Sequence, residues 1–111
     1  MSAALNRLLV LEDRQRIPDD AGGFSETWVA LGEVWAEVRV RTGRGTEYGL
    51  LPTARTAYRI VVRGAPFGVP SRPMAGQRFR EGDRLYQIEA VAERDPEGRY
   101  LICFATEEVA A

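Results

Sequence analysis

The chain has 111 residues, of which 45% are hydrophobic and 28% charged, and its formal net charge is −1. This composition is typical of one globular domain with a modest core and excludes a disordered chain. The near-neutral balance also excludes a protein whose whole surface grips DNA, because phosphate binding needs a basic footprint. We expect a single domain over residues 1–111 that gains stability from contacts with neighbouring subunits.

Side chains for the common kinds of catalysis are missing. Histidine is absent and Cys103 is the single cysteine, so catalytic triads, zinc sites and thiolate mechanisms lack their groups. Asp19 with Asp20, and Glu107 with Glu108, have the chemistry for magnesium, but solvated surface charge is the ordinary interpretation of both pairs. We expect no enzyme, metal or cofactor, and a buried thiol at Cys103 in the run YLICFA. Apolar runs are too short to span a bilayer, so no membrane partner is expected.

The first half of the chain reads as a hairpin followed by a long strand. Residues 8–16 (LLVLEDRQR) alternate with Leu9 and Leu11 on one face, and the following PDDAGG has turn chemistry. Residues 24–41 resume with strand formers, and Gly32 predicts a bulge or bend there. Strict alternation then puts Val34, Ala36, Val38 and Val40 on one face and Trp35, Glu37, Arg39 and Arg41 on the other.

The second half supplies more strands around one loop. TAYRIVVR predicts a strand with Tyr58, Ile60 and Val62 inward, and the Pro- and Gly-rich residues 64–77 predict a loop. DRLYQIEAVAE and RYLICFATE predict two further strands joined by the turn DPEG, the first with Tyr86, Ile88 and Ala90 on one face. The expected fold class is mainly β: five or six strands in a small β-barrel or strongly curved sheet, with a long loop between the second and third strands.

Positive charge is concentrated around that long loop. Residues 39–63 contain six arginines and a single acid, Glu47, which is a local balance of +5, whereas the rest of the chain balances to −6. The GRG at 43–45 lacks the spacing of a dinucleotide fingerprint and the lysine of a P-loop. A connector of about 15 residues, 42–56, is uncommon in a compact domain unless it is functional or disordered.

Five blocks of sequence, taken in order, resemble a known family. They are LLVLEDRQR, DDAGGFSETW, EVWAEVRVRTGRG, TAYRIVVR and GDRLYQIEAVAERDPEGRYLICFATEE. The pattern resembles the head–tail connector proteins of tailed phages, also called head-closure, head–tail joining or stopper proteins. The resemblance covers nearly the full chain, although Tyr58 stands where the family often has a histidine.

The resemblance implies a structural role in a virion neck assembled in the bacterial cytoplasm. It implies a homo-oligomeric ring, six- or twelve-fold, with a portal or adaptor protein on the head side and a tail terminator or tail-completion protein on the tail side. The ring retains the packaged genome and contacts double-stranded DNA weakly and without sequence preference. A tailed phage, a prophage and a phage-like gene transfer particle all remain open.

The resemblance also assigns a role to the connector, and the strand pattern itself points to a subunit boundary. The connector 42–56 is expected to face the channel as a gate, and the residues expected there are Gly43, Arg44, Gly45, Glu47, Tyr48, Leu50, Leu51 and Arg55. An aromatic side chain on a charged strand face is typical of a subunit boundary. The residues expected at that boundary are Trp35, Arg39, Arg41 and Arg59.

Two other classes of function compete with a connector. A stand-alone β-barrel could bind single-stranded nucleic acid through its arginines, with Tyr48 and Trp35 as stacking platforms. Aromatic residues are too sparse along the basic segment to favour it. The remaining alternative is a small enzyme with a carboxylate-bound metal.

Overall fold

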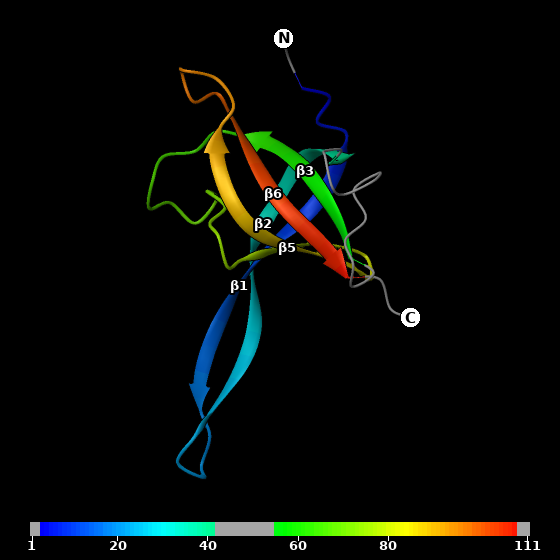
Figure 1. Cartoon of the computed structure of the whole chain (residues 1–111). Helices are drawn as coiled ribbons and strands as arrows, with labels where there is room; N and C mark the ends of the chain where they lie inside the picture. The colour runs from blue at the N-terminus through cyan, green and yellow to red at the C-terminus, as the bar shows by residue number, and fades with distance from the viewer. Residues whose placement is uncertain (1–2, 42–54, 109–111) are drawn as a thin grey trace.

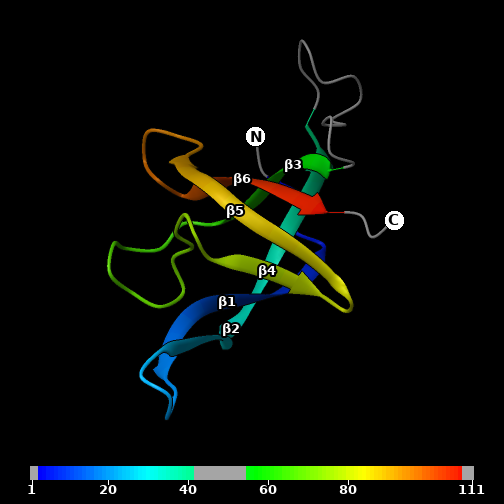
Figure 2. The same ribbon diagram turned by 60° about the horizontal axis from the view of Figure 1, so that its bottom comes forward.

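Six antiparallel strands form a closed barrel in the computed structural model, which describes residues 3–41 and 55–108 (Figure 1). The strands are β1 (Arg7–Pro18), β2 (Phe24–Val40), β3 (Arg55–Arg63), β4 (Arg78–Glu81), β5 (Arg84–Glu93) and β6 (Tyr100–Glu108). They pair in the order β1-β2-β3-β6-β5-β4, and β4 returns to β1 to close the ring (Figure 2). Within the described ranges there is no helix, and hence none able to cross a membrane. The mainly β fold class is confirmed.

One core fills the barrel, built from the inward side chains of alternating positions. Leu9, Leu11, Ile60, Val62, Phe79, Tyr86, Leu101 and Cys103 are all almost fully buried. The inward faces expected for the first and third strands are therefore confirmed, as is the buried thiol. Val40 shares the face of Ala36 but is 47% exposed, because it lies at the end of the barrel.

Two bulges change which residues face inward. Between Leu11 and Glu12 the register with β2 shifts, which leaves Leu31 as the extra residue beside Gly32, whose φ of 151° suits glycine. The expected bend at Gly32 is confirmed. A second shift lies between Ile88 and Ala90 on β5. The expectation that Ala90 faces inward is wrong, because the bulge turns it to solvent and brings Val91 against the core.

Strand β4 is absent from the sequence-based expectation. It has four residues, too few for a pattern of alternation to stand out after the Pro- and Gly-rich loop. Its role is nevertheless large, because Phe79 is fully buried and the pairing of β4 with both β1 and β5 closes the barrel. The loop 64–77 is confirmed, and it begins at Gly64, where a Cβ would lie 1.9 Å from the carbonyl oxygen of Gly98.

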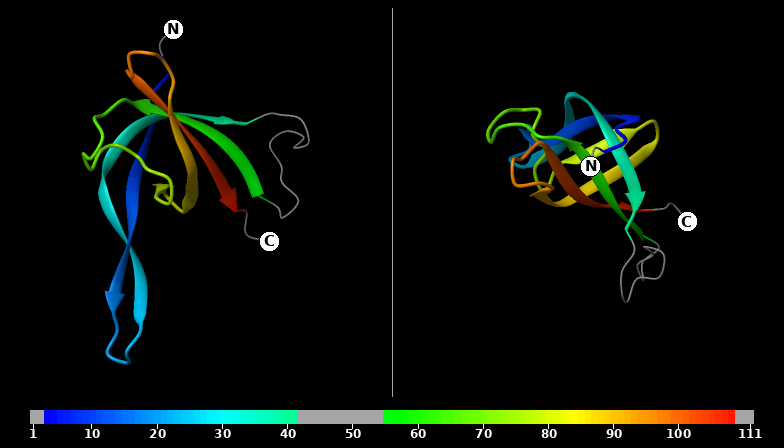
Figure 3. Two further views of the ribbon diagram at one scale, coloured as in Figure 1. Left: turned by 60° about the vertical axis from the view of Figure 1, so that its left-hand side comes forward. Right: turned by 90° about the horizontal axis from the view of Figure 1, so that it is seen from above.

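The β1–β2 ribbon is longer than the barrel needs. Only Val10, Leu11 and Glu12 of β1 pair with β4, and β2 pairs with β3 only from Ala36 onward. The remaining part projects as a twisted two-stranded arm, residues 13–29, away from the N-terminus and the β5–β6 hairpin (Figure 3, left). At its tip, the carboxylate of Asp19 accepts hydrogen bonds from the backbone N–H groups of Ala21 and Gly23, both at 2.9 Å.

Candidate functional site

The outer face of β2 and β3 carries several exposed arginines. Arg39 and Arg59 lie directly opposite each other across the two strands, an arrangement of like charges that destabilises a sheet. Arg39 has one acidic neighbour, Glu37, at 3.3 Å, yet its side chain remains 72% exposed. Arg59 and Arg63 are exposed on the same face. This face therefore carries a net positive charge.

Trp35 lies on the same side of the barrel wall and is 55% exposed. It pairs across the ribbon with Leu8, which is 40% exposed. Trp35 therefore lies outside the core of its own barrel, on the outward face that alternation predicts. Two large apolar side chains side by side beside a charged strip are typical of a surface that a partner covers.

The other expected site residues fall into two groups. Arg41 packs its guanidinium 5.2 Å from the ring centroid of Phe104, and its backbone N–H donates to the carbonyl of Ala57 at 2.8 Å. Arg55 is the exposed first residue of β3. The remaining expected gate residues lie outside the described residues: Gly43, Arg44, Gly45, Glu47, Tyr48, Leu50 and Leu51.

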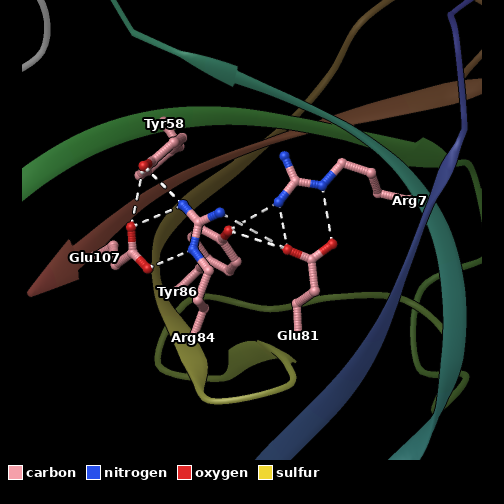
Figure 4. A network of polar contacts seen from close by, with 6 residues as sticks. All are labelled: Arg7, Tyr58, Glu81, Arg84, Tyr86 and Glu107. Atoms are coloured by element: carbon pink, nitrogen blue, oxygen red, sulfur yellow. Dashed lines mark hydrogen bonds and ion pairs between the residues drawn. The ribbon is translucent and has the colours of Figure 1, made fainter.

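The sequence reasoning missed a network of paired charges at the end of the barrel where β1 begins (Figure 4). Arg84 donates from Nε and Nη2 to the two oxygens of Glu107 at 2.8 and 3.0 Å. Tyr58 donates to Glu107 at 3.0 Å. Glu107 is thus a structural group of β6, and its interpretation as solvated tail charge is wrong.

The same network continues across the barrel to β1. Arg7 holds both oxygens of Glu81, with Nε to Oε2 at 2.9 Å. Tyr86 lies between the two ion pairs, and its ring meets that of Tyr58 edge to face with centroids 5.2 Å apart. Residues of β1, β3, β4, β5 and β6 are therefore joined at one end of the barrel by side-chain hydrogen bonds.

The network holds its groups in fixed charge states. The hydrogen bond from Arg7 lowers the pKa of Glu81, and the one from Arg84 lowers the pKa of Glu107. Burial raises the pKa of Tyr86 to about 12. The arginines thus favour the ionised carboxylates, and burial favours the neutral hydroxyl of Tyr86. The network is suited to holding strands together rather than to chemistry.

A second ion cluster, with a buried carboxylate, lies on the outer wall where the arm leaves the barrel. Glu12 accepts from Nε of Arg78 at 2.7 Å and from Nε of Arg80 at 3.0 Å, and only 8% of its side chain is exposed. Arg78 also stacks 4.1 Å from the ring centroid of Trp28. The sequence offers no clear signal for this cluster, because both arginines belong to the short strand β4. In the described part of the chain, no three acidic or sulfur side chains gather as metal ligands.

Comparisons with known proteins place this barrel in a family. A sequence profile described as phage head completion protein matches residues 1–108. A chain from a structure described as the virion of a native gene transfer agent (GTA) particle is 51% identical, with a TM-score of 0.79 over 99% of this chain and 100% of that chain.

A protein from Shigella flexneri 2a, whose structure was determined in solution, is 18% identical with a TM-score of 0.70 over 96% of each chain, which shows the fold alone. Curated protein sequences give no match. The profile match over almost the full length confirms the resemblance carried by the five sequence blocks: this chain belongs to the phage head completion protein family.

Proposed function

We propose that this protein, a structural virion component, forms a homo-oligomeric ring in the neck of a phage-like particle, between the portal or its adaptor and the tail. The ring closes the DNA channel after packaging and gives the tail a surface on which to dock. Family membership and the full-length likeness to a chain of a gene transfer agent particle support the virion role. Both are consistent with a protein that is not an enzyme, and the absence of catalysis stays a prediction.

The exposed residues on the outer face of β2 and β3 are the main support for a ring. Trp35 and Leu8 expose apolar surface, and the opposed Arg39 and Arg59 lack a sufficient acidic counterpart within the described chain. Neighbouring subunits that cover this face would bury the first pair and neutralise the second. Large exposed aromatics at such a boundary carry more than about 2 kcal/mol of binding free energy.

The interface is tested with Trp35→Ala. We expect fewer rings on assembled particles, counted by electron microscopy, with little change in the melting temperature of the isolated chain. Leu85→Ala is the control, because Leu85 is an exposed apolar side chain (36%) on β5, which pairs with β4 and β6 and not with the basic strands. Equal losses of melting temperature and of assembly in Trp35→Ala would contradict the interface.

The gate is tested separately, by shortening the connector between residues 43 and 54. The strands on both sides of it, β2 and β3, pair with each other and with the rest of the barrel, so the barrel should fold and the ring should assemble. Packaged DNA should then leak from tailless particles, measured as nuclease-sensitive genome. Particles that carry the shortened chain in normal rings and retain DNA as wild type does would show that 42–56 is not the gate.

A further inference from the structure

The projecting arm, residues 13–29, has strand edges that pair with no other strand of the described chain. Along residues 13–18 and 24–35 each strand of the ribbon has a single neighbour in the described chain, so one edge of each stays unpaired. A two-stranded hairpin alone is marginally stable at best in water. Phe24 and Ile17, near the tip, are 58% and 48% exposed. The arm therefore offers apolar side chains and strand edges that a partner can cover.

The same chain carries a groove of suitable chemistry. It has a volume of about 230 Å³ and lies where β3 ends, beside the N-terminal segment. Its apolar wall is formed by Leu5, Val34, Trp35, Val62 and Ala65. A groove of this kind accepts an aromatic or aliphatic side chain, and the exposed Trp35 forms part of its wall.

Charges of both signs lie at the tip and at the groove. The tip carries Arg16, whose guanidinium lies 4.4 Å from the ring centroid of Phe24, and Asp20. The groove is lined by Glu33 and Arg63. All four are exposed, and no ion pair joins any of them to another described residue. Each site thus offers a cation and an anion that no ion pair within the described chain holds.

The tip cannot reach the groove of its own chain. Phe24 pairs with Pro18 at the tip, whereas Trp35 pairs with Leu8, ten residues earlier on β1. A strand rises about 3.3 Å per residue, so the two places lie roughly 30 Å apart along one ribbon. Only a second copy can bring them together.

We propose that the tip of the arm of one subunit inserts into the groove beside Trp35 of the next subunit, with Phe24 as its apolar anchor and with Arg16 facing Glu33. This inference rests on the proposed ring and names the contact that builds it. Because tip and groove are different surfaces, the contact is heterologous, and heterologous contacts generate closed rings when the rotation closes.

Cross-linking between engineered cysteines tests the contact. The doubly substituted chain Ala21→Cys with Ser71→Cys places one thiol at the tip and one at the groove. Cys103 is fully buried and its pKa is raised by burial to about 12, so the two added thiols react first. After treatment of assembled particles with a short bis-maleimide, we expect a ladder of covalent trimers and larger species. Each single variant should give dimers at most.

The control pairs Ala21→Cys with Glu89→Cys, since Glu89 is exposed on β5 and does not line the groove. That pair should give no ladder. A charge exchange provides the second measurement: Arg16→Glu and Glu33→Arg should each weaken the ladder of the tip–groove pair several-fold, and the two together should restore it.

The outcomes separate the contact from the ring. Rings visible by electron microscopy without a tip–groove ladder would overturn the contact and leave the proposed function standing. Cross-links from the tip to a different protein would overturn it too, by showing that the arm docks outside the ring. Particles in which wild-type chain forms no ring would overturn the proposed function and this contact together.

Discussion

Strand β1 has two very different ends. Where it begins, Arg7 joins a network in which both carboxylates of Figure 4 are paired with arginines. Where it ends, the arm leaves the barrel with apolar side chains at its tip exposed and with strand edges unpaired. The same ribbon is thus complete in its own barrel at one end and incomplete at the other. Stability and assembly should therefore respond to different residues.

The largest contrast should come from one substitution made in both regions. Phe79→Ala removes a fully buried ring from the closing strand and should lower the free energy of unfolding by about 3–5 kcal/mol. Phe24→Ala removes an exposed ring from the arm and should change it by no more than about 0.5 kcal/mol. Urea unfolding of both purified variants measures this. A cost for Phe24→Ala comparable to that of Phe79→Ala would mean that the arm is part of the core.

A smaller contrast compares two glutamates that both pair with arginine. Glu12 is held between Arg78 and Arg80 with 8% of its side chain exposed, whereas Glu26 pairs with Arg14 at 3.4 Å and is 52% exposed. Glu12→Gln weakens two charge-assisted hydrogen bonds at a buried site and should cost about 1–3 kcal/mol.

The matched change Glu26→Gln should cost at most about 1 kcal/mol, because solvent and salt screen an exposed pair. Thermal unfolding at low and moderate salt measures both. Salt should reduce the small effect of Glu26→Gln more than that of Glu12→Gln. The reverse order of costs would show that the cluster at the base of the arm does not stabilise the barrel.

The long strands with a regular alternation could be predicted from the sequence. The bulge in β5 and the short strand β4 that closes the barrel could not. Alternation correctly placed Leu9 and Ile60 on the buried face and Trp35 on the exposed face. It succeeds there because apolar and polar residues alternate along a long strand that has one buried face. Ala90 was misplaced because a bulge adds one residue without a compositional mark. Strand β4 was too short to be visible as a pattern.

The candidate site divides in the same way. Trp35 and Arg39 could be assigned to an exposed face by counting along one strand. The network of Arg7, Glu81 and Glu107 could not, since Arg7 and Glu81 lie 74 residues apart and meet only through barrel closure. The hairpin that forms the arm was expected from the sequence. Its length outside the barrel was not, because it depends on where β4 and β3 stop pairing with β1 and β2, and no local sequence pattern marks those points.

The smallest expected effect is a change with pH in the cost of Glu12→Gln. Burial opposes ionisation of Glu12, but the hydrogen bonds and charges of Arg78 and Arg80 together outweigh it and lower the pKa of this carboxyl below its ordinary 4.5. The unfolded chain therefore takes up a proton at Glu12 before the folded chain does as the pH falls. The stabilisation by ionised Glu12 is complete above about pH 4.5 and is lost as the pH falls through the folded pKa.

The difference in free energy of unfolding between wild type and Glu12→Gln should accordingly be constant from pH 7 to about pH 5 and shrink toward pH 3, because protonated Glu12 is as neutral as glutamine. Urea unfolding at a series of pH values measures it. Phe79→Ala is the control: it removes no titrating group, so its difference from wild type should stay constant where the Glu12→Gln difference falls. A Glu12→Gln difference that stays constant or grows below pH 4.5 would mean that the arginines do not hold Glu12 ionised, and that the barrel is closed at the base of the arm by packing alone.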